Sequence, residues 1–212
     1  MEKKIISIGK QDFAWLREND CFYVDKTNMI REWWESKDDV TLITRPRRFG
    51  KTLNMSMLNC FFSNRYTGRE DLFEGLSIWK QEKYRKLQGT YPVIFISFAD
   101  VKQTNYKDAI QQIKKIIYET FRQFPELHEW KEQENEWLQP GIGWNIQPEM
   151  DDVTAQNALK DLAGSLYAYY GKKAIILLDE YDTPMQEAYV HGYWDEFTAF
   201  IRSLFNSVFK TN

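Results

Sequence analysis

The sequence predicts an α/β fold with a mostly parallel sheet that helices cover on both faces. Three short apolar runs are expected to be strands: Val40–Thr44, Pro92–Phe98 and Ala174–Leu178. Amphipathic patterns lie between and after them, with apolar residues at the three- and four-residue spacing of helices. The alternation of the two patterns is typical of strands that are joined by helical crossovers.

Each predicted helix has an apolar face to pack on such a sheet. A shorter helix is expected around Asp71–Trp79, in an otherwise polar region. Gly171 directly follows the third long helix, a position where glycine often ends a helix. The long predicted helices are Lys51–Phe62, Tyr106–Phe124, Val153–Tyr170 and Trp194–Phe209.

Residues 125–150 break this pattern. They are polar, rich in Glu, Gln and Trp, and contain Pro140, Gly141, Gly143 and Pro148. An insertion or lid-like loop is expected there. No linker divides the 212 residues, so one domain over residues 1–212 is predicted.

Composition and net charge limit the classes of protein to which this chain can belong. The net charge of −3 provides no overall field that would gather nucleic acid or an anionic membrane. The cysteines, Cys21 and Cys60, are too few for a disulfide framework, so buried free thiols are expected. An aromatic content of 16% favours an aromatic core over a base-stacking surface. No signal peptide or membrane span is recognised, so a cytoplasmic protein is expected.

The segment Thr44–Thr52 carries the strongest functional signal. It ends in Gly50, Lys51 and Thr52, as the phosphate-binding pattern G-x-x-x-x-G-K-[ST] does, between a predicted strand and a predicted helix. Backbone N–H groups at a helix N-terminus attract phosphate. Gly50 would allow close approach of the backbone, Lys51 would reach the β- and γ-phosphates, and Thr52 would place its hydroxyl on Mg²⁺.

Arg45 stands where the pattern has its first glycine. Pro46 fixes one φ angle and favours an extended Arg45, which would stiffen the loop. Arg47 and Arg48 add cationic donors for a phosphate. The alternative is a basic strand-to-helix turn with solvated arginines. The predicted nucleotide-binding residues are Arg47, Arg48, Phe49, Gly50, Lys51, Thr52 and Leu53.

The last predicted strand ends in Asp179 and Glu180. In phosphate-loop ATPases an Asp at a strand end holds the Mg²⁺ shell, and an adjacent Glu can act as general base on the attacking water. Parallel sheets bind ligands at this end of their strands. Thr52 and Asp179 are therefore the predicted metal ligands, and Glu180 is the predicted catalytic residue. The alternative is a solvated acidic turn that caps the next helix.

Three segments together resemble the bacterial AAA-ATPase-like family. They are Tyr23–Thr27 (YVDKT), Thr44–Thr52 (TRPRRFGKT) and Leu178–Pro184 (LDEYDTP). The resemblance runs from about residue 5 to residue 212. It implies a three-layer phosphate-loop NTPase fold of the additional-strand class, and an arginine-rich loop without its leading glycine is a hallmark of this family.

The resemblance implies that ATP and Mg²⁺ are bound, with Lys51 and Thr52 on phosphate and Mg²⁺, Asp179 on the Mg²⁺ shell and Glu180 on the water. It implies that Asp25–Thr27 starts a helix near the nucleotide base. Asp182 and Pro184 belong to the same signature, and a structural capping role is expected for Asp182.

Members of this family often carry a restriction-endonuclease-like domain after the ATPase domain. A further strand with a polar sensor normally follows the acidic strand, and the sequence up to Asn212 does not include it. We therefore expect the N-terminal and central part of a longer ATPase, with weak nucleotide binding and little hydrolysis by itself. A natural short form is the alternative.

Two other functions stay open at this point. One is a nucleotide-regulated interaction module that binds ATP without hydrolysing it. The other is a nucleic-acid-binding protein whose basic loop contacts backbone phosphates, against which the net charge of −3 argues. The sequence does not decide whether subunits assemble into a homo-oligomer.

Overall fold

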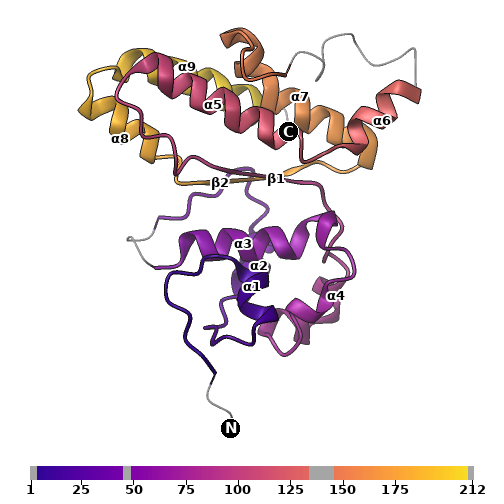
Figure 1. Cartoon of the computed structure of the whole chain (residues 1–212). Helices are drawn as coiled ribbons and strands as arrows, with labels where there is room; N and C mark the ends of the chain where they lie inside the picture. Colours follow the sequence, from indigo (N-terminus) through magenta and orange to yellow (C-terminus); the bar gives the residue numbers. More distant parts are fainter. Residues whose placement is uncertain (1–3, 45–48, 134–145, 210–212) are drawn as a thin grey trace. The chain divides into compact units, whose positions relative to one another are not determined.

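The computed structural model describes residues 4–44, 49–133 and 146–209 (Figure 1). The chain divides into two compact units, Met1–Val93 and Ile94–Asn212. Arg47 and Arg48 of the predicted loop, like Arg45, lie outside the described residues. Among the described residues, no helix has both the length and the apolar character needed to cross a membrane.

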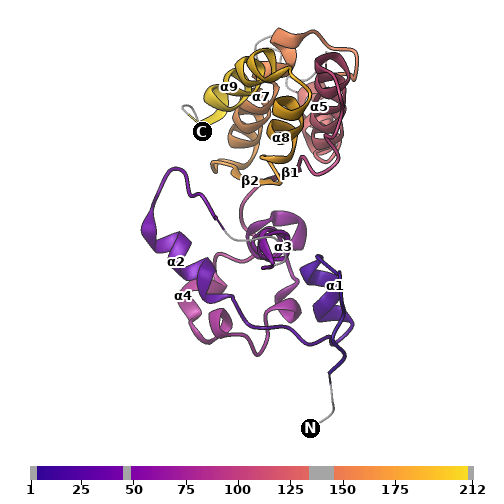
Figure 2. The same ribbon diagram turned by 90° about the vertical axis from the view of Figure 1, so that its left-hand side faces the viewer.

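The first unit consists mainly of helices around α3, the helix that follows the predicted phosphate loop. Figure 2 shows α1 and α2 flanking α3. The α-helices are α1 (Phe13–Glu18), α2 (Asn28–Ser36), α3 (Lys51–Phe62) and α4 (Glu82–Arg85), and the 3-10 helices are η1 (Asn64–Tyr66), η2 (Glu70–Leu72) and η3 (Ser77–Lys80).

Aromatic side chains form the core of this unit. Phe13, Phe61, Phe62 and Phe73 are fully buried. The ring centroid of Phe61 lies 5.0 Å from that of Phe62 and 5.1 Å from that of Phe73. Trp34 of α2 stacks on Phe62 at 5.7 Å. Such pairs add to the stabilisation that comes from burying the rings. The predicted aromatic core is confirmed, and Cys21 and Cys60 are buried free thiols as expected.

The second unit is built on a two-stranded parallel sheet of β1 (Val93–Ser97) and β2 (Ile175–Asp179). The connection between the strands contains α5 (Tyr106–Phe121), α6 (Glu126–Gln133) and α7 (Asp152–Tyr170). After β2 follow α8 (Thr183–Val190) and α9 (Trp194–Phe209). Within this unit, α5, α7, α8 and α9 gather on the same side of the two strands (Figures 1 and 2).

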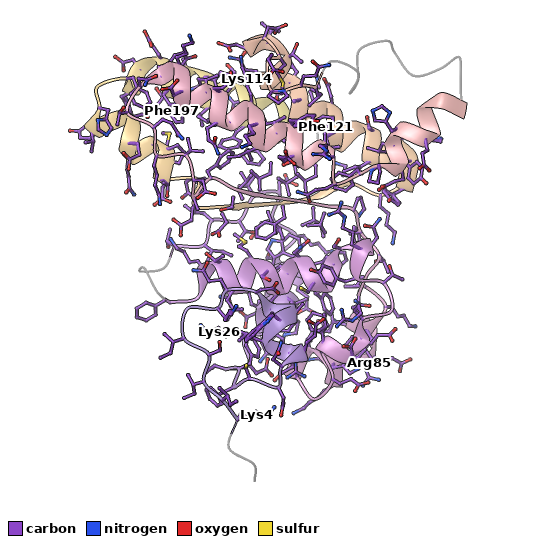
Figure 3. The ribbon with its side chains drawn as sticks, in the orientation of Figure 1. Lys4, Lys26, Arg85, Lys114, Phe121 and Phe197 are labelled. Carbon is purple, nitrogen blue, oxygen red and sulfur yellow. The ribbon has the colours of Figure 1, made fainter. Side chains whose placement is uncertain are left out.

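The second unit has one apolar core between β1 and the helices. Ile94 and Ile96 of β1 are buried together with the apolar faces of α5, α7 and α9. An ion pair of 2.8 Å between Lys114 of α5 and Asp152 of α7 joins two of these helices (Figure 3). Gly171 ends α7 in the left-handed conformation with φ 67°, as its position in the sequence predicts. The α/β class and the four long helices are thus confirmed.

Two local predictions are wrong, and a third is changed in part. Val40–Thr44 forms no strand, and its apolar residues Val40 and Leu42 are 60% and 63% exposed. A short β-branched run becomes a strand only where a partner pairs with it and a core covers it. The expected helix at Asp71–Trp79 is instead covered by the separate 3-10 turns η2 and η3. The segment 125–150, expected to be an insertion or lid-like loop, begins with the helix α6, and its residues 134–145 lie outside the described residues.

Candidate anion and acidic sites

The first N–H groups of α3 have no acceptor among the described residues. Its cap residue, Gly50, adopts the left-handed conformation with φ 78° and ψ 28° and has no side chain to cap the helix. The first helical hydrogen bond runs from the Asn54 N–H to the Gly50 carbonyl oxygen over 2.9 Å. The N–H groups of Lys51, Thr52 and Leu53 therefore have no acceptor within the helix. Such groups, with the helix dipole behind them, bind anions.

Conformation, rather than crowding, explains the glycine at position 50. A Cβ atom added there would meet the Lys26 Nζ at 3.6 Å, which is an ordinary contact distance. A positive φ of 78° is costly for other L-residues, because their Cβ then approaches the neighbouring carbonyl. Gly50 thus lets the chain turn sharply into α3.

The two side chains that the sequence assigns to phosphate and metal are available. Lys51 and Thr52 are half-buried, and neither side chain makes a hydrogen bond or ion pair within the described residues. Phe49, just before the turn, is 58% exposed, and Leu53 is half-buried. The described residues therefore contain the helix half of the predicted strand–loop–helix arrangement. The strand half is absent, since Val40–Thr44 is not a strand.

Lys26 adds a cation to this site that the motif search did not find. Its Nζ donates a hydrogen bond of 3.3 Å to the carbonyl oxygen of Phe49, next to Gly50. Figure 3 labels Lys26. Lys26 lies directly before Thr27, which is the N-cap residue of α2. The resemblance had placed Asp25–Thr27 at the start of a helix, and a helix does begin there. The contact with the loop could not be read from the sequence.

Asp25 and Thr27 hold the backbone around Lys26. The Asp25 Oδ1 accepts hydrogen bonds from the Thr27 N–H and hydroxyl, at 2.9 and 2.6 Å. Its Oδ2 accepts from the Ser77 N–H and hydroxyl, at 2.7 and 2.6 Å. The buried Thr27 hydroxyl accepts from the Ile78 N–H at 3.1 Å. Desolvation by itself would raise the pKa of Asp25, but the hydrogen bonds from Ser77 and Thr27 outweigh it and lower the pKa.

The acidic site lies at the C-terminal end of β2, in the second unit. Asp179 is 4% exposed, and its backbone carbonyl accepts a hydrogen bond of 3.0 Å from the N–H of Phe98, just beyond β1. Within the described residues its carboxylate has no hydrogen-bond or ion-pair partner. A carboxylate at the end of a parallel strand is an oxygen ligand of the type that Mg²⁺ accepts, so Asp179 suits a metal-binding role.

Glu180 begins the turn from β2 into α8. It adopts the left-handed conformation with φ 51°, which is uncommon for a residue with a side chain. Its backbone carbonyl accepts from the Thr183 N–H at 3.1 Å, and its Oε2 accepts from the Thr183 hydroxyl at 3.4 Å. The side chain is therefore tied, loosely, to the first turn of α8. This contact partly matches the alternative of an acidic capping turn.

The rest of the LDEYDTP segment builds α8, a helix that the sequence analysis did not predict. Asp182 stands at the N-cap position, but its side chain does not cap the helix and instead accepts a bond of 3.2 Å from Gln186 Nε2. The expected capping role of the Asp182 side chain is thus wrong. Pro184 lies in the first turn of α8. The N–H group that proline lacks would have no acceptor within the helix at this position, and the fixed φ of proline suits a helix.

The described residues offer no closed protein cage for a metal ion. Among the described residues there is no group of three or more His, Cys, Asp or Glu side chains that could hold a metal ion. Mg²⁺ commonly takes one or two protein oxygens and completes its shell with water and substrate phosphates. The Thr52 hydroxyl in the first unit and the Asp179 carboxylate in the second unit are each a ligand type of this kind.

A parallel strand pair with acidic residues at its end, and a helix opened by glycine, are compatible with the phosphate-loop class of α/β proteins. A family model described as "Predicted AAA-ATPase" matches residues 7–212, and the chain belongs to this family. Membership indicates an ATPase-like, nucleotide-binding function. The family that the three sequence segments predict is therefore confirmed.

A curated relative is the "Uncharacterized protein in vnfD 5'region" of Azotobacter chroococcum mcd 1. It is 28% identical over 186 residues, which cover 87% of this chain and 30% of that protein. The chain thus spans less than a third of the length of this relative. No solved structure matches the chain.

Proposed function

We propose that this chain is the core of a Mg²⁺-dependent ATPase. The observation that carries the proposal is the start of α3. There, uncapped N–H groups and the side chains of Lys51 and Thr52, which have no partner in the described part of the chain, follow the left-handed Gly50. These groups together match what a triphosphate needs: backbone donors, a cation and a hydroxyl for the metal. Membership of the family supports the nucleotide.

Each predicted residue has a role in this proposal. Lys51 and the N–H groups of the first turn of α3 bind phosphate oxygens, and Arg47 and Arg48 add positive charge. Thr52 and Asp179 supply the protein oxygens for Mg²⁺, which would neutralise the phosphates as charge develops on them. Glu180 accepts a proton from the attacking water.

Titration with a fluorescent ATP analogue tests the first half of the proposal. Lys51→Ala should weaken binding at least tenfold, since about 1.4 kcal/mol corresponds to that factor and a charged hydrogen bond is worth about 1.5–3 kcal/mol. The matched control is Lys86→Ala, because Lys86 is exposed at the end of α4. Equal affinities for Lys51→Ala and the wild-type chain would contradict the proposal.

The metal roles are tested by a double-mutant cycle. Thr52→Ala and Asp179→Asn should each reduce the gain in ATP affinity that Mg²⁺ provides. If both side chains serve one ion, the double variant should lose little more than either single variant. Full additivity of the two losses would exclude a shared ion. Chelation by EDTA should bring the wild-type chain to the level of the variants.

A second candidate function is nucleotide binding without hydrolysis. The hydrogen bond between Glu180 and Thr183 favours it, because it gives Glu180 a structural role. Turnover by the whole protein and by its Glu180→Gln variant separates the two functions. A loss of about 100-fold or more is expected for a general base. Comparable turnover would favour the regulatory module.

For the whole protein, three further statements are proposals. Residues 1–212 form one ATPase domain, with an insertion at about residues 125–150. A nuclease-like domain follows it, and the protein works in the cytoplasm. Homo-oligomer formation is an open question that sedimentation of the whole protein, with and without ATP, would answer.

A further inference from the structure

We propose that Lys26 is a positioning residue for the anion site at the start of α3, and that Asp25 and Thr27 hold it in place. The proposal deepens the proposed function and rests on it for the identity of the anion. It starts from the hydrogen bond of 3.3 Å between the Lys26 Nζ and the Phe49 carbonyl oxygen.

The planar peptide bond between Phe49 and Gly50 explains how this contact affects the anion site. The Phe49 carbonyl and the Gly50 N–H belong to one planar trans peptide group, so they point in opposite directions. A donor that holds the carbonyl therefore also sets the direction of the N–H. Lys26 thus orients the last donor before α3, at the residue whose left-handed conformation opens the helix.

Lys26 also brings charge to the site. An ammonium group has three donors, and the Phe49 carbonyl takes one of them. The amine lies 3.6 Å from the position that a Cβ on Gly50 would occupy, so it is close to the backbone that would approach a phosphate. The remaining N–H donors and the charge favour an anion at this helix end.

Lys26 is exposed, but its two neighbours in the chain are held by hydrogen bonds. The Asp25 carboxylate accepts four hydrogen bonds, two from Thr27 and two from Ser77. The Thr27 hydroxyl oxygen in turn accepts a hydrogen bond from the Ile78 N–H. These bonds fix the chain on both sides of Lys26 to η3, so little backbone entropy remains to be lost when its amine reaches Phe49.

The contact itself is tested in the ligand-free chain by NMR. In Lys26→Met, the Phe49 carbonyl ¹³C signal should move upfield and the Gly50 amide signal should shift, because a charged donor is lost. Lys26→Gln keeps a neutral donor and should retain part of the signal position, whereas the control Lys86→Met should leave both signals unchanged. An unaltered Phe49 carbonyl signal in Lys26→Met would overturn the proposal, whatever the chain binds.

The effect on binding is measured with MgATP and with inorganic pyrophosphate. Lys26→Met should weaken both about fivefold, the size expected for a partly exposed charge contact. Lys26→Arg should restore most of the affinity. Asp25→Asn should weaken binding in the wild-type background but have no further effect in the Lys26→Met background, although it lowers the melting temperature in both.

The outcomes separate the two proposals. If the wild-type chain binds neither ligand while the Phe49 signal still responds to Lys26→Met, the ATPase proposal fails and the positioning of the loop stands. If Asp25→Asn weakens binding equally in both backgrounds, Asp25 does not act through Lys26. If Lys26→Met binds as tightly as the wild-type chain, the positioning role is excluded.

Discussion

The Lys26 amine donates a hydrogen bond to the carbonyl of Phe49, a residue 23 positions further along the chain. It joins the YVDKT segment to the FGKT turn at the start of α3. The two motifs, which look independent in the sequence, thus form one local structure in the first unit. Its conformation depends on a glycine, on a lysine and on the carboxylate that holds the lysine segment.

Because Gly50 is left-handed, we expect alanine substitutions at Gly50 and at Gly164 to change the free energy of unfolding in opposite directions. Gly50→Ala should lower the free energy of unfolding by about 1 kcal/mol, because alanine at a positive φ is strained. Gly164→Ala, inside α7, should raise it by about 0.5–1 kcal/mol, because the added Cβ meets no described atom within 4 Å beyond the backbone of its own helix and its chain neighbours. Urea unfolding measures both. A stabilising Gly50→Ala would mean that this turn is not left-handed in solution.

Asp25 predicts a pH dependence of stability. Its folded-state pKa is lowered, so its contribution is complete above the unfolded value of about 3.9 and is lost as the pH falls through the folded value. The stability gap between wild type and Asp25→Asn should therefore be constant at neutral pH and shrink in acid. Urea unfolding from pH 7 to pH 3 measures it. Asp39→Asn, at an exposed aspartate, is the control and should show no such gap.

We expect a substitution at Glu180 to affect the stability and the activity of the protein differently. Its φ of 51° is strained for a side-chain-bearing residue, and strain of this kind gathers at functional sites. Glu180→Gly should keep or raise the free energy of unfolding by up to about 1 kcal/mol, while ATP turnover by the whole protein is lost. The control Glu187→Gly, within α8, should destabilise by about 1 kcal/mol. Equal destabilisation by both would argue against strain at Glu180.

Because both cysteines are buried, we expect their thiols to react slowly in the folded chain. Burial raises the pKa of the Cys60 thiol to about 11, so little thiolate is present at pH 8. Cys21 is 4% exposed and Cys60 1%. Ellman's reagent should therefore react slowly with the folded chain and rapidly with two thiols in urea. Rapid reaction of the folded Cys60→Ser variant would show that Cys21 is accessible.

Much of the second unit could be predicted from periodicity. Residues 194–209 repeat apolar side chains at helical spacing, and α9 has these same bounds. The β2 strand was also found, because its apolar run is bounded by Gly171 and by Asp179. Such segments bury one continuous face, so the pattern in the sequence and the packing agree.

The first unit was harder to predict. Val40–Thr44 has the composition of a strand but remains exposed and unpaired within the described residues. The helix α1 of this unit, like α8 of the second unit, is short, with six and eight residues respectively, and both show little periodicity. Short helices depend on tertiary contacts more than on intrinsic propensity. For the same reason, two 3-10 turns replace the single helix expected at residues 71–79.

The sequence by itself determined the family, the α/β class and the candidate chemistry of Lys51, Thr52, Asp179 and Glu180, because these depend on residue types at fixed spacing. Only the tertiary structure decided that Lys26 contacts the Phe49 carbonyl and that Asp25 binds Ser77. Those contacts join residues 23 and 52 positions apart. Chain folding creates such neighbours, and no local pattern encodes them.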